Sequence, residues 1–224
     1  MLMIQPARSP ETHNNLSTDH GVAPTEPHND TRAEVTTQRS WLERLVRALA
    51  NEFGNLNVRL LVARAAVSVL PDLCFCRVRT FIYRHLAGIP IGSHTLILGT
   101  MDFTETRNVQ QRLRIGKHVI INKRFFADVT GNITIGDYVN LGHHIVMITA
   151  DHDIGPPQRR VGTIRPRAIT IENGCWIGAR STILPGVNIG ASSVVTAGAL
   201  VAASVSANKM VGGVPARVIK TLSS

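Results

Sequence analysis

Three histidines in the second half of the chain are candidates for acid–base chemistry. His143 and His144 are adjacent, and His152 stands between Asp151 and Asp153. The pKa of an imidazole lies near neutrality, so a histidine can take a proton from an alcohol as that alcohol attacks a carbonyl group. Neighbouring residues on a strand point to opposite faces, so neither aspartate is a secure partner for the His152 ring, and a backbone carbonyl is the alternative. The pattern is typical of a general base, although adjacent histidines on a surface are commonly just solvated.

The serine and cysteine positions argue against a covalent mechanism. No serine or cysteine stands in the glycine-flanked turn that exposes an activated nucleophile, so we expect direct transfer rather than an acyl-enzyme. The chain has three cysteines, of which Cys74 and Cys76 have no second pair to complete a metal site. We expect no metal, and we expect these thiols and Cys175 to be reduced and buried.

A six-residue repeat runs through the second half of the chain. An aliphatic residue returns at every sixth position: Ile171, Ile177, Ile183, Ile189, Val195 and Val201. A small or β-branched residue follows four positions after each: Cys175, Ser181, Val187, Ser193, Ala199 and Val205. A period of six is neither the 3.6 of a helix nor the 2 of a strand, and it is typical of a β-helix whose coils each contain three short strands. We predict a mainly β fold, a left-handed parallel β-helix of hexapeptide repeats.

The repeat also runs upstream, with one shift of phase and one interruption. Two earlier coils fit the period, Ile115-Ile121-Ala127 and Ile135-Leu141-Met147. The dipeptide Ile133-Thr134 shifts the phase by two between them, and the pattern stops between Asp153 and Ala168. We therefore place the β-helix at 91–208, with a loop at 153–168 and a short C-terminal segment at 209–224. Repeat coils cannot bury their apolar faces alone, and prisms of this architecture usually form trimers, so we expect a homotrimer.

The N-terminal part of the chain has a different composition. Residues 1–40 are polar and lack apolar periodicity, so we expect a disordered tail without a secretory signal. Residues 41–90 show helical patterns at 41–53, 60–70 and 78–86, none long enough to span a membrane. These helices either pack on the end of the prism or on a partner subunit, or they lie at a lipid surface near a lipid-linked substrate. We expect a cytoplasmic protein, with peripheral contact at the inner face of the membrane as the second alternative.

The net charge of +9 invites a nucleic-acid hypothesis. Aromatic residues make up only 4% of the chain, too few for base-stacking platforms, and there is no recognised binding module. Arginines cluster instead at Arg159, Arg160, Arg165 and Arg167. Such a cluster suits acidic glycans, phosphorylated carriers or nucleotide phosphates, and simple solvation is the alternative. We expect no nucleic-acid partner.

Five short motifs carry a family resemblance. They are Gly131–Asp137 (GNITIGD), Thr149–Asp153 (TADHD), Cys175–Gly178 (CWIG), Leu184–Val187 (LPGV) and Gly212–Ile219 (GGVPARVI). From Ile115 onward the chain resembles the galactoside, maltose and nodulation-type O-acetyltransferases of the hexapeptide family. Its N-terminal extension is similar to the branch that acetylates exopolysaccharide and lipopolysaccharide sugars. The motifs specify the family but not the acceptor.

The resemblance implies an acetyl-CoA-dependent O-acetyltransferase that modifies a sugar hydroxyl in polysaccharide or glycolipid biosynthesis. His152 matches the catalytic histidine of the family, and either His143 or His144 would line the same groove beside the acceptor. Asn122 matches an asparagine that contacts the acceptor sugar or the developing oxyanion, for which an amide is a suitable donor. The alternative for Asn122 is a structural role at a coil corner, where asparagine tolerates a left-handed backbone.

The same resemblance implies where the cofactor binds. Ala179 and Ala197 match the small residues beside the pantetheine arm of acetyl-CoA, and Arg217 matches a basic residue near the nucleotide phosphates. The threonine-lysine pair usual in the family is replaced by Ala202 and Ala203, so one phosphate contact is missing or is supplied by Lys209 or Lys220.

Three other functions share this architecture. An N-acetyltransferase or a serine acetyltransferase-like enzyme would differ in the loop at 153–168, and a scaffold protein would need no base. A prism-shaped carbonic anhydrase needs three histidines on zinc, two of them five positions apart. The nine histidines of this chain contain no such pair, which argues against that enzyme.

Overall fold

The computed structural model describes residues 41, 43–48, 54, 56–104 and 107–223. The chain divides into two units, Met1–Arg47 and Ala48–Ser224. The tail expected at 1–40 lies outside the described residues, as does part of the helix expected at 41–53. Trp41 and residues 43–48 are helical, and their side chains are exposed.

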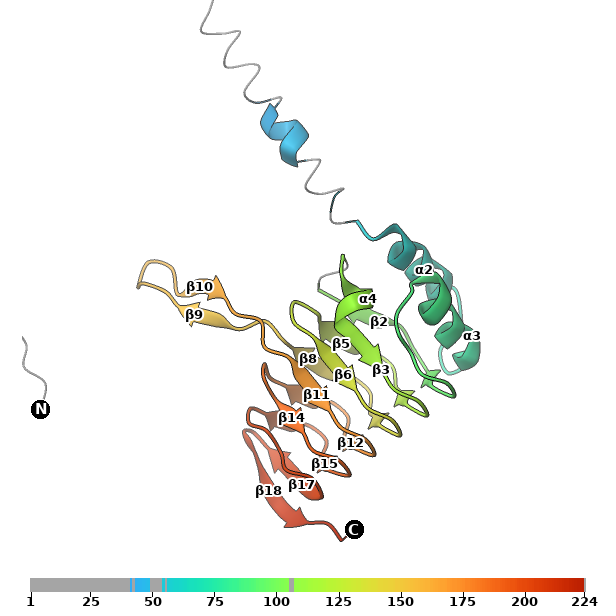
Figure 1. Cartoon of the computed structure of the whole chain (residues 1–224), viewed down its shortest axis with the longest axis vertical. Helices are drawn as coiled ribbons and strands as arrows, with labels where there is room; N and C mark the ends of the chain where they lie inside the picture. Colours follow the sequence, from blue (N-terminus) through green and yellow to red (C-terminus); the bar gives the residue numbers. More distant parts are fainter. Residues whose placement is uncertain (1–40, 42, 49–53, 55, 105–106, 224) are drawn as a thin grey trace, which may run out of the picture. The chain divides into compact units, whose positions relative to one another are not determined.

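The second unit contains a parallel β-helix with three faces, each a stack of short strands (Figure 1). Face 1 consists of β3 (Leu113–Ile115), β6 (Ile133–Ile135), β11 (Ile169–Ile171) and β14 (Asn188–Ile189). Face 2 consists of β1 (Leu96–Ile97), β4 (Ile120–Ile121), β7 (Asn140–Leu141), β12 (Trp176–Ile177), β15 (Val194–Val195) and β17 (Lys209–Gly213), with β18 (Ala216–Thr221) added antiparallel. Face 3 consists of β2 (Met101–Phe103), β5 (Phe125–Asp128), β8 (Val146–Ile148), β13 (Thr182–Ile183) and β16 (Leu200–Val201).

The hexapeptide positions form the core of this prism. All six aliphatic residues from Ile171 to Val201 are at most 1% exposed, and the small residues that follow them are also buried. The strands stack in register, so Ile121, Leu141, Ile177 and Val195 form one inward column on face 2. The predicted mainly β fold of parallel hexapeptide coils is confirmed.

The phase shift at Ile133 does not break the stack. Strand β6 pairs with β3 so that Ile133 lies opposite Leu113 and Ile135 opposite Ile115. The two extra residues are taken up in the turn between β5 and β6. The register of face 1 is therefore kept across a coil that is two residues longer.

The corners of the coils constrain the backbone in two ways, by positive φ angles at one corner and by close contact between coils at another. The corner before face 2 has positive φ in successive coils at His94, His118, Tyr138, Gly174, Ser192 and Asn208. At the corner after face 2 the coils stack closely. A Cβ atom at Gly142 would lie 2.5 Å from the backbone nitrogen of Ala179, and one at Gly178 would lie 2.5 Å from that of Ala197. Glycine is required at both positions because any side chain would collide with the next coil.

Short helices cover the first coil. They are α2 (Val58–Ser68), α3 (Cys76–Phe81) and the π-helical turn η1 (Ile82–Leu86), and α4 (Val109–Arg112) precedes β3. Leu60, Ala63 and Val67 of α2 are buried in the same hydrophobic cluster as the prism core. Arg79 is 1% exposed and donates to backbone carbonyls, including that of Ile97 at the start of the prism. Packing on the end of the prism is therefore confirmed for α2, α3 and η1.

Two further features complete the fold. No helix among the described residues is long and apolar enough to cross a membrane. The expectation of buried cysteines is correct for Cys175 and wrong for Cys74, which is exposed because it lies in the turn before α3.

The interruption of the repeat is an antiparallel hairpin and not an irregular loop. Strand β9 (His152–Ile154) pairs with β10 (Val161–Ile164), and Figure 1 shows this hairpin projecting away from the stacked coils. The exposed fractions of Ile154 and Val161 are 86% and 58%. The prism of one chain therefore leaves the apolar residues of this hairpin uncovered.

Candidate active site

A groove with a volume of about 550 Å³ runs along the outer side of face 2. Its floor includes Trp176, Val194 and Met210, which lie in register on β12, β15 and β17. Four of the site residues expected from the sequence line its walls: Asn122, His143, Ala179 and Ala197. The coil stacking thus brings together residues that are up to 75 positions apart in the chain.

Asn122 follows β4 at the corner between faces 2 and 3. It is not among the described residues with positive φ, so a left-handed backbone does not explain an asparagine here. Its side-chain Nδ2 donates to the carbonyl of Leu141 at 3.3 Å. An amide nitrogen carries two hydrogens, so one donor remains for a ligand in the groove.

The histidine pair is divided between two environments. His143 lines the groove, whereas His144 occupies the adjacent corner position with a φ of 58° and is not part of the groove wall. Partial desolvation, followed by the guanidinium groups of Arg124 and Arg180, lowers the pKa of His144. His143 is therefore the member of the pair that a ligand in the groove would meet.

Small residues shape one wall of the groove. Ala179 is half-buried and follows the corner glycine Gly178, whereas Ala197 is exposed and precedes Gly198. Because neither side chain extends beyond a methyl group, the wall stays open to a narrow ligand that runs across successive coils. Close stacking of the coils explains the corner glycines, whereas the small alanine side chains leave space beside the groove floor.

His152 lies on the β9–β10 hairpin, where its side chain is exposed. Its Nδ1 is 3.3 Å from the carbonyl oxygen of Gly162, so a backbone carbonyl orients the ring, as one of the two alternatives predicted. The flanking aspartates have other partners. Asp151 pairs with Arg167 and Asp153 with Arg165, each at 2.6 Å.

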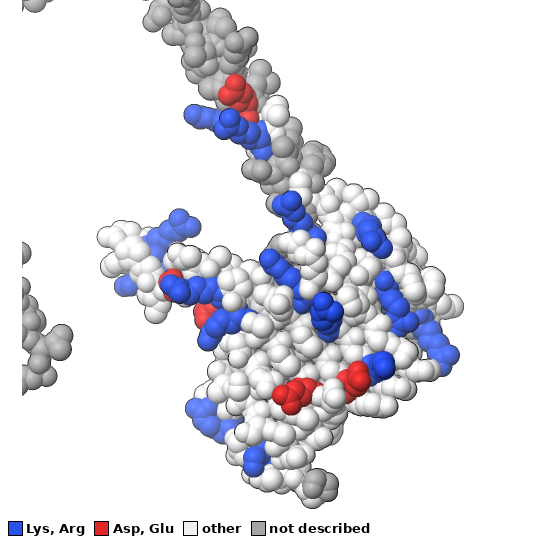
Figure 2. Space-filling model, viewed as in Figure 1, with Lys and Arg blue, Asp and Glu red and all other residues white. Residues whose placement is uncertain are grey.

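These ion pairs involve two of the four clustered arginines, Arg165 and Arg167. Figure 2 shows basic and acidic groups side by side where this hairpin lies, which agrees with the two ion pairs. Arg160 donates to the carbonyl of Gly155 within the same hairpin. At least half of the cluster therefore has a role in holding the hairpin together.

His152 and Asn122 lie at different corners of the prism. The hairpin leaves face 3 after β8 and returns to face 1 at β11, whereas Asn122 stands where face 2 meets face 3. His152 does not line the groove that contains Asn122 and His143. A single chain therefore separates the candidate base from the candidate acceptor site by the width of face 3.

A buried carboxylate holds the base of this hairpin, and sequence inspection did not reveal it. Asp128 is 4% exposed and accepts hydrogen bonds from the hydroxyls of Thr104 and Thr130 and from the backbone N–H groups of Thr149 and Ala150. Burial would raise the pKa of Asp128, but the hydrogen bonds outweigh it and lower the pKa to about 2. The carboxylate thus fixes the backbone two residues before His152.

The basic residues near the C-terminus, Lys209, Arg217 and Lys220, lie on the last two strands of face 2 and do not themselves line the groove. Arg217 and Lys220 on β18 pair with Gly212 and Met210 on β17, and Met210 belongs to the groove floor. The Nζ of Lys209 donates to the hydroxyl of Thr221 at 2.7 Å. Ala202 is exposed after β16 and does not line the groove of a single chain.

Comparison with known proteins places this arrangement in a family. The hexapeptide repeat of succinyl-transferase matches residues 168–203. A hexapeptide-repeat acetyltransferase from Vibrio cholerae is 30% identical, with a TM-score of 0.62 over 80% of this chain and 93% of that chain. The structure of the Vibrio cholerae acetyltransferase in complex with acetyl coenzyme A gives a sequence identity of 29% and a TM-score of 0.65, over 77% of this chain and 90% of that chain.

This chain belongs to the hexapeptide-repeat acetyltransferase family. The galactoside O-acetyltransferase of Escherichia coli K12 is 34% identical over 113 residues, which are 48% of this chain and 56% of that protein. The nodulation protein L of Rhizobium meliloti is 39% identical over 106 residues, which are 47% of this chain and 58% of that protein. The chain thus spans a little over half the length of these curated relatives. The predicted family resemblance is confirmed.

Proposed function

We propose that this family member is an acetyl-CoA-dependent O-acetyltransferase that transfers an acetyl group to a sugar hydroxyl. The groove on face 2 is the observation that carries the proposal. It combines an apolar floor with a wall of small residues. Arg217 and Lys220 lie beyond its lining on β18, the strand that pairs with β17 at the end of the floor. This arrangement fits an extended thioester cofactor with phosphates at one end, and the Vibrio cholerae relative was solved with acetyl coenzyme A. The cofactor would supply the acetyl group, activated as a thioester.

The residues of the chain provide a base and a hydrogen-bond donor. His152 accepts the hydroxyl proton of the acceptor at Nε2, because Nδ1 is engaged by the carbonyl of Gly162. Asn122 donates the free hydrogen of its amide either to the oxygen that gains negative charge or to the sugar. His143 lines the groove beside Asn122 and contacts the acceptor. No covalent intermediate on the protein is needed.

The complete site requires two copies of the chain, and we propose a homotrimer. His152 and Asn122 lie at opposite ends of face 3, so His152 of one protomer is paired with the groove of its neighbour. The three-faced prism allows a closed ring of such contacts. Polysaccharide or glycolipid biosynthesis in the cytoplasm is the setting we propose, with galactoside O-acetyltransferase as the named relative that suggests a sugar acceptor.

Mixing of two inactive variants tests this arrangement. His152→Ala and Asn122→Ala chains are mixed in equal amounts under conditions that exchange subunits. If each site uses two protomers, about a quarter of the sites regain both residues, and about that fraction of wild-type acetyl transfer returns. If both residues come from one chain, every site stays defective and no activity returns.

An acceptor screen tests the chemistry itself. Purified protein is incubated with acetyl-CoA and a panel of sugars, lipid-linked glycans, amino sugars and serine, and the products are identified by mass spectrometry. O-acetylated sugars support the proposal. Transfer only to amines or to serine replaces it with the corresponding alternative, and the absence of acetyl-CoA binding favours a scaffold.

A further inference from the structure

A second cavity lies at the other end of the prism, between the helices and the first strand of face 2. Its volume is about 260 Å³, and none of the residues that line it belongs to the groove described above. Arg77, Arg84 and His94 line it together with Phe81 and Leu96. We propose that this cavity binds a phosphate group, and that this site is separate from the proposed acetyl-transfer site and independent of that function.

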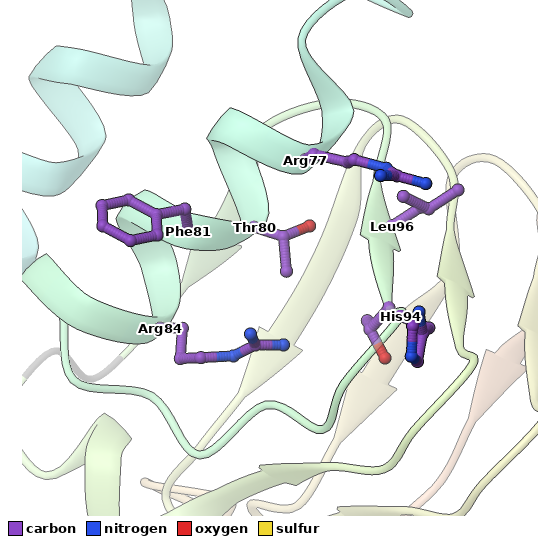
Figure 3. Close-up of a pocket in the computed structure, with 7 residues that line it drawn as sticks. Arg77, Thr80, Phe81, Arg84, His94 and Leu96 are labelled. Carbon is purple, nitrogen blue, oxygen red and sulfur yellow. The ribbon is translucent and has the colours of Figure 1, made fainter.

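Two guanidinium groups provide the positive charge. Figure 3 shows the Arg77 and Arg84 side chains extending from the helices toward the side of the cavity where His94 lies. The Nε of Arg84 donates to the carbonyl of Ile91 at 2.8 Å, and its Nη2 donates to the carbonyl of Gly92. The Arg84 guanidinium is therefore held in place, with its remaining N–H groups available to a ligand. Arginine is the side chain best suited to bind phosphate oxygens.

Among the described residues that line the cavity, none carries an acidic side chain that would neutralise these cations. Two carboxylates of the surrounding region are paired elsewhere. Asp72 lies 3.0 Å from Lys123, and Asp102 lies 2.8 Å from Arg64. The cavity thus keeps its positive potential, which favours an anion over a neutral ligand.

The His94 ring is fixed before any ligand binds. His94 occupies a corner with a φ of 59°, and its ring stacks on that of His118 with centroids 4.8 Å apart. His118 stacks in turn on Tyr138 with centroids 4.7 Å apart. Three successive coils therefore hold the ring in one orientation. A ligand that accepts a hydrogen bond from it does not have to order a mobile side chain.

The remaining walls indicate what the phosphate is attached to. Phe81 is 60% exposed, and Leu96 provides a second apolar surface. The hydroxyl of Thr80 is already engaged, because it donates to the carbonyl of Cys76 and accepts from the backbone of Ile97. Charge on one side and apolar surface on the other fit a phosphate ester with a less polar substituent. A soluble phosphorylated sugar and a phospholipid headgroup share this chemistry.

The test uses the full chain and inorganic phosphate as the probe. Phosphate is titrated while the ring resonances of His94 are followed by NMR, with His94→Gln used to assign them. We expect saturable shifts, with an affinity that falls roughly tenfold or more in Arg77→Gln, because one charged hydrogen-bonding group is lost. Arg77 is exposed, so this change leaves the fold intact. The matched control is Arg114→Gln, an exposed arginine on β3 that lines neither cavity.

Each outcome of this test is decisive. The proposal is overturned if the His94 resonances do not respond, or if Arg77→Gln and Arg114→Gln weaken binding equally. Co-sedimentation with phosphatidylglycerol and phosphatidylcholine vesicles then identifies the source of the phosphate. Binding to the anionic vesicles that is lost in Arg77→Gln assigns a lipid headgroup. A response to free phosphate without vesicle binding assigns a soluble phosphate ester.

Discussion

In the β9–β10 hairpin, the Nδ1 atom of His152 lies 3.3 Å from the carbonyl oxygen of Gly162. A carbonyl oxygen can only accept a hydrogen bond, so in the neutral ring this contact requires the hydrogen on Nδ1 and leaves the lone pair on Nε2. The hairpin therefore sets both the tautomer and the direction of the ring. The base proposed for acetyl transfer depends on this contact between two strands, and not on the aspartates that flank His152 in the sequence.

Replacing His152 by alanine is expected to lower turnover by roughly 10²- to 10⁴-fold, the usual effect of a positioned base. Acetyl-CoA affinity should hardly change, because the imidazole meets the reacting hydroxyl and not the nucleotide. Steady-state kinetics and calorimetry measure the two effects separately.

The matched control for that variant is His144→Ala, which removes an exposed histidine outside the groove. His152→Asn further tests shape against chemistry, because asparagine fills similar space without titrating. Near-normal turnover in both His152 variants would transfer the role of base to His143.

Asp128→Asn is expected to loosen the base of the hairpin and to lower turnover. An amide in place of the carboxylate would set its N–H₂ group against backbone N–H donors in either orientation, because Thr149 and Ala150 donate to one carboxylate oxygen and Thr130 donates to the other. Rescue of turnover is expected for Asp128→Glu only if its carboxylate reaches the same donors. Normal turnover in Asp128→Asn would show that the network does not position His152.

The same residue should make stability depend on pH in acid. The pKa of Asp128 is lowered to about 2 in the folded chain, so its contribution is complete above an unfolded pKa of about 3.9 and is lost as the pH falls toward 2. The full shift corresponds to about 2.5 kcal/mol, of which about 2 kcal/mol is lost between pH 6 and pH 2.5. Urea unfolding at pH 6 and pH 2.5 should show the wild type losing about that much more stability than Asp128→Asn. Equal losses would contradict the ionised, hydrogen-bonded carboxylate.

Ala197→Leu is expected to raise KM for acetyl-CoA by roughly tenfold, because the larger side chain fills the wall of the groove. Ala207→Leu is the matched control. Ala207 stands against Gly190 as Ala197 stands against Gly178, and both alanines are exposed, but Ala207 does not line the groove. Thermal unfolding shows whether both variants fold. An equal rise of KM in the two variants would argue against this groove as the cofactor site.

Arg217→Ala and Lys220→Ala are each expected to raise KM for acetyl-CoA more than they lower turnover, since phosphate contacts lie far from the reacting carbonyl. The effect should weaken at high salt, because exposed charge interactions are screened. Arg114→Ala serves as the control for loss of one exposed cation. A loss confined to turnover would place Arg217 and Lys220 in another role.

The core of this protein could be predicted from the sequence because burial repeats along the chain. Each sixth residue from Ile171 to Val201 points inward, and a local period is enough to show it. The family motifs are equally local, and the resemblance that they carry pointed to Asn122, His143, Ala179 and Ala197 as candidate site residues. The apolar stretch at 60–70, stopped by Pro71, indicated α2, and the single stretch at 78–86 indicated α3 and η1 together.

Contacts between coils could be identified only in the tertiary structure, because an insertion changes which residues of neighbouring coils lie side by side. The interruption at 153–168 is visible in the sequence, but its hairpin and the carbonyl of Gly162 beside His152 are not. Asp128 acquires its partners from three separate coils, and no spacing rule relates them. The placement of Asn122 and His152 at different corners likewise follows from the three-sided path of the chain. The repeat determined the prism, whereas only the stacked coils decided which functional groups share a site.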